Sequence, residues 1–280
     1  MNKSVECVRR DVGYVRQSLD RLQKFKGWVV VEKIECKKML YLDVCTRWNS
    51  TYLMLDTAQN FERAFERFEE QDTNFEAELE SGEGWPSVDD WANVRNLGDF
   101  VEHFYEVTLR ISGTSYVTSN NFFDEFSEID FLLRDAQLNN NVDFNVMAIK
   151  MKKKYDKYWG DIDKMNLLMF VACVLDPRQK LKYLEFALSE MSSSEKACEM
   201  MQKLKESLYE FFDEYKPPLH SEANEEFVED FDILWWKVNN PRFPTLSKMA
   251  KDVLAIPVST VASESAFSTK GRVLDQYRSS

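Results

Sequence analysis

Apolar residues three and four positions apart recur along most of this sequence, and this spacing constrains the fold more than any other feature. Such residues form one apolar stripe on a helix surface. In the first part of the chain the stripe comprises Val5, Val8, Val12, Val15, Leu19 and Leu22. The spacing returns in residues 97–111 and 197–215. Only residues 28–31 and 39–44 are good strand candidates, and both are short, so the sequence predicts a mainly α protein.

Charged residues and cysteines limit the class of protein. The 280 residues carry a formal net charge of −12, so a nucleic-acid site would have to be a local basic patch. The five cysteines are scattered and the histidines number only two, which argues against a zinc site and for a reducing compartment. The longest apolar run, residues 167–175, is too short to span a membrane, and the first residues lack a signal-peptide core. We therefore expect a soluble intracellular chain.

Residues 231–278 contain a dense set of large apolar side chains. Trp235 and Trp236 are adjacent, and Pro257 ends the apolar helix that follows them. That helix is predicted from the spacing of Leu246, Met249, Ala250, Val253 and Leu254. Two adjacent tryptophans bury a large area, and this area must meet either the chain's own core or another subunit.

The motifs of this stretch resemble the C-terminal dimerisation region of hAT-superfamily transposases. The matching motifs are DILWWK, then N-x-P-x-F-P-x-L-x-x-M-A, then DVLAIPVSTVASESAFS, in that order. They are most similar to the domesticated plant members of the Ricesleeper and Daysleeper type. The resemblance implies a homodimer, or docking to a full-length relative, through Trp235, Trp236, Phe243, Leu246, Met249 and Phe267.

A second motif, TRWNSTY at residues 46–52, resembles the segment that follows the last strand of the RNase H-like core in the same family. By this resemblance Trp48 stacks on a flipped base near the DNA break, and Arg47 lies beside a phosphate. Stacking on an unpaired base is chemically sound and tolerant of sequence. Against this, a tryptophan where a strand meets a helix is more often part of the core. The family-like segments KYDKYW at 154–159 and LDPRQKL at 175–181 extend the resemblance.

The densest basic cluster falls in residues 150–157. On a helix, one face would carry Lys150, Lys153, Lys154 and Lys157. Such a face could follow a DNA phosphate backbone, and the alternative is a solvated lysine face with no ligand. A further set of basic residues on the first helix is interpreted as solvated surface charge: Arg9, Arg10, Arg16, Arg21 and Lys24.

Carboxylates decide whether such a chain can cut DNA. Family transposases resemble RNase H in using two aspartates and one glutamate to hold two divalent metal ions. By motif position the glutamate is Glu264, which we interpret as vestigial, while both aspartates and the family's zinc finger would lie upstream of residue 1. Asp176 precedes a proline and is interpreted as a turn residue, with a metal-ligand role as the alternative. We therefore expect no catalysis by this chain alone and no cofactor, with Mg²⁺ relevant only if the missing aspartates are supplied.

The resemblance implies a fold that is mainly α, with a partial RNase H-like α/β core. Its parts would be a remnant of that core at residues 1–68, a helical insertion region at 91–215 and the dimerisation region at 228–280. The missing strands should leave apolar surface near residues 39–44 uncovered. The function we favour is a truncated or domesticated hAT-type protein that binds DNA and dimerises in the nucleus. A fragment of an active transposase with an Asp-Asp-Glu two-metal mechanism, and a helical interaction module without a nucleic-acid role, stay open.

Overall fold

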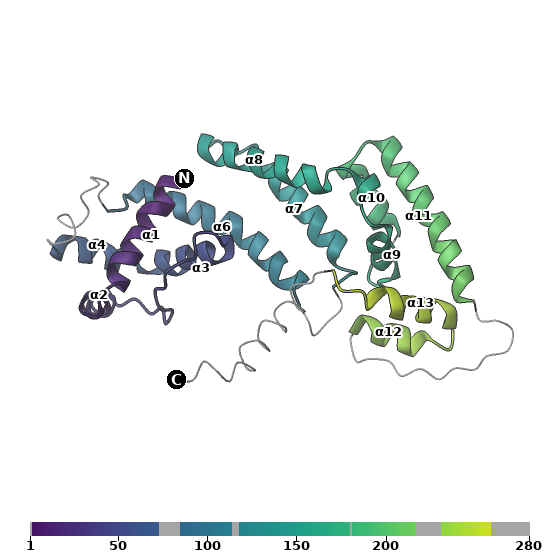
Figure 1. Cartoon of the computed structure of the whole chain (residues 1–280), viewed down its shortest axis with the longest axis horizontal. Helices are drawn as coiled ribbons and strands as arrows, with labels where there is room; N and C mark the ends of the chain where they lie inside the picture. Colours follow the sequence, from purple (N-terminus) through teal and green to yellow (C-terminus); the bar gives the residue numbers. More distant parts are fainter. Residues whose placement is uncertain (1, 73–84, 114–117, 180, 217–230, 259–280) are drawn as a thin grey trace, which may run out of the picture. The chain divides into compact units, whose positions relative to one another are not determined.

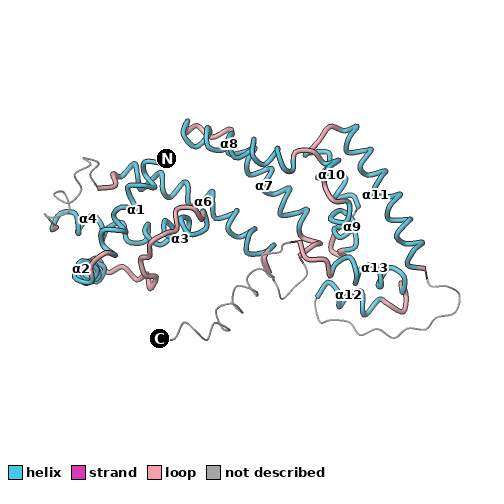
Figure 2. The backbone as a smooth tube through the Cα atoms, viewed as in Figure 1, coloured by secondary structure: helices cyan, strands magenta, loops and turns pink. Residues whose placement is uncertain are grey.

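The computed structural model describes residues 2–72, 85–113, 118–179, 181–216 and 231–258. In this part of the chain every regular element is a helix, and no strand is present (Figures 1 and 2). The expectation of a mainly α fold is confirmed. The chain divides into two compact units, Met1–Glu106 and Val107–Ser280. None of the described helices is long and apolar enough to cross a membrane.

The core of the first unit is built on the apolar stripe of its first helix. The helices of this unit are α1 (Asn2–Arg16), α2 (Leu19–Val31), α3 (Trp48–Ala58), the short 3₁₀ helix η1 (Gln59–Phe61), α4 (Glu62–Gln71) and the first part of α6 (Val88–Ile111). On α1, Val8 and Val12 have no exposed surface. Phe25 of α2 packs against Phe65 of α4, with ring centroids 4.7 Å apart. The spacing of Val5, Val8, Val12 and Val15 is therefore the spacing that buries this core. Leu19 of the same predicted stripe is instead 80% exposed, because a second helix begins at that residue.

Residues 28–31, the first strand candidate, lie in helix α2, so that prediction was wrong. Helical spacing places Trp28 against the same apolar core that Phe25 enters. Burial along this stripe outweighs the strand preference of three consecutive valines, because tertiary packing overrides local propensity. The helix ends before Lys33, whose φ of 53° lies in the left-handed region that stops a helix.

Residues 39–44, the second strand candidate, form neither a helix nor a strand. A strand needs a neighbouring strand for its ladder of hydrogen bonds, and the described part of this unit has none. Leu40 is buried in the core, whereas Met39, Leu42 and Val44 are 60%, 51% and 49% exposed. The strand prediction was wrong, but the expectation of uncovered apolar surface at this place is confirmed.

The second unit is organised around α9 (Leu167–Leu175), a helix of nine apolar residues. The other helices are α7 (Phe122–Ala136), α8 (Val142–Trp159), η2 (Ile162–Lys164), α10 (Leu181–Met191), α11 (Ser194–Tyr215), α12 (Phe231–Asn239) and α13 (Pro244–Leu254). Helix α9 contacts α7, α10, α11 and α13. Asn166 caps its start by accepting a hydrogen bond from Leu168 N at 3.0 Å, and Pro177 prevents its continuation.

The two C-terminal helices complete the core of the second unit. Figure 1 shows α12 and α13 side by side, and α13 also contacts α9 and α11. The indole of Trp236 is buried and donates from Nε1 to Leu175 O at 2.8 Å. Tyr215 at the end of α11 donates from its hydroxyl to Asp252 Oδ2 of α13 at 2.8 Å. Helices α12 and α13 therefore contribute to this unit's own core and are not an appended tail.

Candidate nucleic-acid site at the start of helix α3

Trp48 is the first residue of α3, and its side chain is 46% exposed. A turn aims it outward, because Arg47 N donates to Val44 O at 2.7 Å and Ser50 N donates to Arg47 O at 2.9 Å. The side chain of Arg47 makes no capping hydrogen bond, although Arg47 is the N-cap residue of α3. Its guanidinium is exposed and forms no ion pair with any residue that the structure describes. The structure thus places the sequence-predicted pair on the surface, where the core alternative for Trp48 does not hold.

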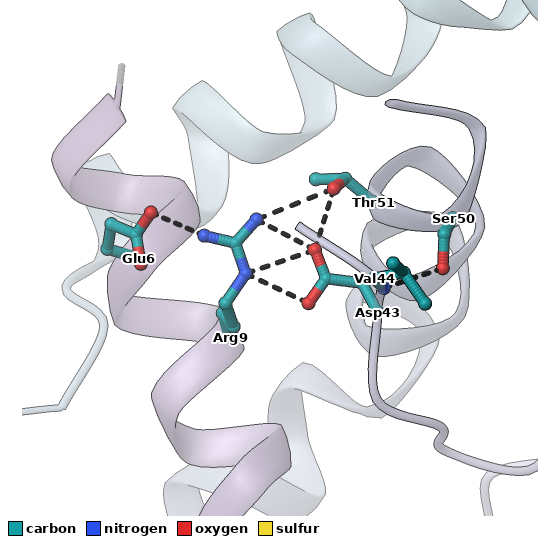
Figure 3. A network of polar contacts seen from close by, with 6 residues as sticks. All are labelled: Glu6, Arg9, Asp43, Val44, Ser50 and Thr51. Carbon is teal, nitrogen blue, oxygen red and sulfur yellow. Dashed lines mark hydrogen bonds and ion pairs between the residues drawn. The ribbon is translucent and has the colours of Figure 1, made fainter. Parts of the chain in front are cut away.

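An ionic network fixes the backbone that leads into this turn (Figure 3). Arg9 of α1 approaches Asp43 with Nε 2.9 Å from Oδ1 and Nη2 2.7 Å from Oδ2. Thr51 of α3 donates from Oγ1 to Asp43 Oδ2 at 2.6 Å. The same guanidinium also donates a hydrogen bond from Nη1 to Glu6 Oε1. Two helices that lie far apart in the sequence are therefore joined through one carboxylate.

The surroundings of Asp43 keep this link charged. Burial alone would raise the pKa of the Asp43 carboxyl, but the hydrogen bonds from Arg9 and Thr51 outweigh it and hold the pKa below its usual range. The bond to Asp43 in turn raises the pKa of the Arg9 guanidinium. The Asp43 side chain is only 3% exposed, so loss of the arginine would leave a buried carboxylate without its main partner. The network supports the turn that carries Trp48.

Beside this network lies a cavity of about 430 Å³ that opens to the surface. Its walls come from α1, the turn before α3, α3 itself and α6, and they include Arg9, Thr46, Trp48, Tyr52 and Gly98. One wall is therefore an exposed indole, and another carries a guanidinium and hydroxyl groups. A planar aromatic ligand would find both a stacking surface and hydrogen-bonding groups there.

Arg9, Asp43 and Glu6 were missed as members of this site by sequence reasoning. The interpretation of Arg9 as solvated surface charge was wrong, because its side chain is only 21% exposed and is bound to Asp43. The signal available in the sequence was the position of Asp43, a few residues before the Trp48 motif. Nothing in the spacing points to Arg9, because a tertiary contact spans the 34 positions between the two residues.

The predicted lysine cluster lies on α8 of the second unit. Lys150, Lys153, Lys154 and Lys157 are exposed, and none of them forms an ion pair within the described residues. Lys152 differs, because its Nζ lies 3.0 Å from Asp130 Oδ1 and also contacts Asp156. Tyr155 and Phe144 on the opposite side of α8 are buried. One face of this helix therefore presents four cations without acidic partners.

The residues expected at a dimer interface fall into three groups. Trp236 and Met249 are buried in the second unit, and Phe243 and Leu246 pack partly buried against the same core. Trp235 is 40% exposed on α12. Phe267 and the catalytic-motif residue Glu264 lie outside the described residues. Of the set, Trp235 is the large side chain that the described structure leaves available to a partner.

Asp176 has a structural role at the end of α9. It accepts hydrogen bonds from Arg178 N at 2.8 Å and from Asn120 Nδ2 at 2.8 Å, and the Arg178 guanidinium forms an ion pair with it. Burial would raise the pKa of its carboxyl, but these bonds outweigh burial and lower the pKa. In the part of the chain that the structure describes, no group of three His, Cys, Asp or Glu side chains could hold a metal ion. The described residues therefore do not fit a two-metal centre.

Three family models match successive parts of the chain. A model described as the ZBED1 RNase-like helical domain matches residues 1–99. A model of the hAT-like transposase RNase-H fold matches residues 120–215. A model of the hAT family C-terminal dimerisation region matches residues 211–280. Two of the three descriptions name the hAT family, which is the family that the sequence motifs resemble.

Relatives in plants are similar over nearly the whole chain. The rice (Oryza sativa subsp. japonica) zinc finger BED domain-containing protein RICESLEEPER 2 is 30% identical over 98% of this chain and 45% of its own length. The Arabidopsis thaliana protein DAYSLEEPER, also a zinc finger BED domain-containing protein, is 29% identical over 89% of this chain and 40% of its own length. A putative AC transposase of Zea mays is 32% identical over 88% of this chain and 35% of its own length.

The chain spans less than half the length of these relatives. The alignment with the rice protein also runs over 334 positions, more than the 280 residues of this chain. The relative therefore has residues between the matched segments that this chain lacks. Motifs, family models and relatives agree along the sequence, and the chain belongs to the hAT transposase-like family.

Proposed function

We propose that this protein binds DNA with an unpaired base and self-associates, as a truncated or domesticated hAT-type protein that does not itself cut DNA. The observation that carries the proposal is the exposed Trp48, which lies beside Arg47 and forms one wall of the 430 Å³ cavity. An exposed indole held on a rigid turn is a surface for base stacking, and stacking of this kind contributes about 1–3 kcal/mol per base. The protein would bind this DNA in the nucleus.

Phosphate binding would come from cations that have no acidic partner. Arg47 beside Trp48 is one such cation, and the lysines on the exposed face of α8 are four more. The chain as a whole carries a formal net charge of −12, so unpaired cations that gather on one helix face define a local electropositive surface. Neutralising phosphates releases counterions, which makes such binding depend strongly on salt.

Self-association is supported by α12 and by the match to the hAT dimerisation region. Leu234, Trp235 and Val238 are 45%, 40% and 71% exposed and lie within one face of this helix. Burial of such side chains stabilises a complex by about 1.5–3 kcal/mol each, before the cost of association is subtracted. A second copy of the chain or a longer hAT-type relative would cover this face.

The proposal that the chain does not cut DNA rests on its carboxylates. Of the three that the family resemblance requires, Glu264 is the one with a matching motif position in these 280 residues. A single carboxylate cannot hold the two metal ions of that mechanism. Incubation of the chain and labelled DNA ends with Mg²⁺ or Mn²⁺ should give no cleaved or joined product. Cleavage that is lost in Glu264→Gln would support an active transposase instead.

Binding to two DNA substrates of equal length tests the proposed site. One is a fully paired duplex, and the other carries a single unpaired base next to the duplex end. We expect the wild-type chain to prefer the unpaired substrate and Trp48→Ala to weaken that binding by about 5- to 150-fold, the equivalent of about 1–3 kcal/mol. Tyr209→Ala, which removes a 74% exposed aromatic ring from α11, is the matched control and should bind as the wild type does.

Equal binding of the two substrates, or equal loss in both variants, would contradict a stacking role for Trp48. No salt-dependent binding to either DNA would leave a helical protein-interaction module as the better description.

A further inference from the structure

Helix α8 has one side packed against α7 and one side exposed (Figure 1). On the packed side, Tyr155 donates from its hydroxyl to Phe126 O of α7 at 3.1 Å, and the two rings stack with centroids 4.7 Å apart. Phe144 and Ala148 are also buried. Because residues four and seven positions apart share one side of a helix, these three residues of α8 define its inner side.

The first half of the exposed side is apolar. Val142, Val146 and Ile149 are 74%, 43% and 47% exposed. They follow one another at steps of four and three positions and therefore form one stripe on the outer surface of α8. Exposed apolar side chains gathered in this way mark an interaction surface.

The second half of the same side is cationic. Lys153 and Lys157 continue the stripe at further steps of four, and Lys150 and Lys154 lie next to it. Among the described residues, no carboxylate forms an ion pair with these four lysines. The character of this side therefore changes along the helix axis, from apolar to cationic.

This order along the axis indicates the kind of partner. DNA phosphates would contact the lysines but would gain nothing from the apolar stripe. A helix that lies on a membrane has apolar side chains along its whole length and lysines on its other side. A second helix satisfies both halves of α8 if it has carboxylates at one end and apolar side chains at the other.

We propose that the exposed side of α8 binds an acidic amphipathic helix of a partner protein, in antiparallel orientation. This orientation places the first turns of the partner helix beside Lys153 and Lys157, and its last turns beside Val142 and Val146. Carboxylates in the first turns would pair with the lysines and would also be stabilised by the dipole of their own helix. Apolar side chains in the last turns would cover the exposed valines.

A synthetic peptide of about 18 residues, long enough to hold a helix, is the probe. One face of the peptide carries glutamates in its first turns and leucines in its last turns. A scrambled peptide has the same composition without such a face. Fluorescence anisotropy of the labelled peptides, titrated with the full chain in the absence of DNA, measures binding. We expect the designed peptide to bind about tenfold or more tightly than the scrambled one.

Two pairs of valine substitutions provide a matched test. Val142→Gln with Val146→Gln removes apolar surface from α8 and should weaken binding of the designed peptide by about tenfold or more. Val30→Gln with Val31→Gln changes valines that are 76% and 60% exposed on α2 and should leave peptide binding unchanged. In a separate assay DNA binding should be the same in both double variants, because phosphate contacts need only the cations.

The inference is overturned if the designed peptide binds no better than the scrambled one, or if both double variants bind it equally. Equal binding of a peptide with leucines first and glutamates last would contradict the antiparallel orientation. The inference also fails if vesicles of phosphatidylserine and phosphatidylcholine bind the chain and lose that binding in the Val142→Gln, Val146→Gln variant, because a membrane would then be the partner. None of these results depends on the proposed DNA role, because no DNA is present.

Discussion

At the scale of single residues, the two adjacent tryptophans of α12 have different surroundings. Trp236 is 7% exposed and donates to Leu175 O, whereas Trp235 is 40% exposed and meets the indole of Trp236 edge-on. The sequence predicted a large apolar area here but left open whether it meets the chain's own core or another subunit. In the structure Trp236 is part of the core, whereas Trp235 remains available to a partner. Only the packing of α9, far away in the sequence, distinguishes the two.

Substitution of each tryptophan should therefore have a different effect. Trp236→Ala should lower the free energy of unfolding by about 3–5 kcal/mol, because it opens a cavity and leaves Leu175 O without its donor. Trp235→Ala should cost about 1 kcal/mol or less and should instead weaken self-association. Urea unfolding followed by circular dichroism, at one protein concentration, measures the free energy of unfolding of both variants. Equal destabilisation by the two variants would contradict the assignment.

Asp11 of α1 is a buried carboxyl whose oxygens accept no hydrogen bond within the described structure. Burial raises its pKa to about 8, and the charge of Glu69 adds to this, while Arg10 works in the opposite direction with Nε 3.6 Å away from Oδ1. The sequence did not single out this residue, because an aspartate within an apolar stripe looks like any helix carboxylate. Its environment depends on the helices packed around α1.

The raised pKa of Asp11 predicts a dependence of stability on pH. Between the unfolded pKa near 3.8 and the folded pKa of about 8, the folded chain keeps a proton that the unfolded chain has released. Stability is therefore lost as pH rises through this range, by up to about 1.4 kcal/mol per pH unit. Asp11→Asn should be less dependent on pH from pH 5 to pH 8 and more stable than the wild type at pH 7.5. Denaturant unfolding at several pH values checks this, and parallel pH profiles would contradict it.

At the scale of elements, the exposed face of α8 carries the four lysines of the predicted basic cluster. The buried residues and the lysines fall on opposite sides, as the spacing indicated. Changing Lys150, Lys153, Lys154 and Lys157 together to Gln should weaken DNA binding. It should also make the slope of log K against log salt less steep, by about 0.9 for each phosphate contact that is lost. Titrations at several salt concentrations measure the slope.

A second quadruple variant controls for net charge. It changes four exposed lysines outside α8, namely Lys26, Lys182, Lys205 and Lys248, to Gln. This variant has the same net charge as the first and should keep a slope close to that of the wild type. If both variants change the slope equally, the α8 face has no special role and the lysines there are only solvated charges.

The helices themselves could be predicted from sequence, because apolar spacing and caps act locally. Asn166 before α9 and Pro177 after it bound the apolar run of residues 167–175, which forms a nine-residue helix. The strand predictions at residues 28–31 and 39–44 failed because both depend on neighbours. In the first stretch helical burial of Trp28 outweighed β propensity, and in the second no partner strand is present among the described residues.

At the scale of the whole molecule, the C-terminal region contributes to the core of the second unit and also presents the apolar face that we propose for self-association. Helices α12 and α13 fill the core of the second unit through Trp236 and Met249, and the outer face of α12 remains apolar through Leu234, Trp235 and Val238. The motifs predicted the family and the dimerisation role. They could not show that the same short region also stabilises its own unit, because the contacts with Leu175 and Tyr215 are tertiary.

The candidate DNA site was also predicted only in part from the sequence. The motif indicated Arg47 and Trp48, and the structure adds the cavity and the Arg9–Asp43 link that holds the turn. Together these features lead to the central claim that the chain is a self-associating DNA-binding protein.

Sedimentation velocity with a dye on the DNA tests that claim most directly. The full chain, at tens of micromolar, is mixed with a hairpin-ended duplex, and only the DNA is detected. We expect the DNA to sediment in one complex that contains two copies of the chain, and to lose the second copy when Trp235→Ala replaces the wild type. DNA that sediments alone, or with a single wild-type chain, would contradict the claim.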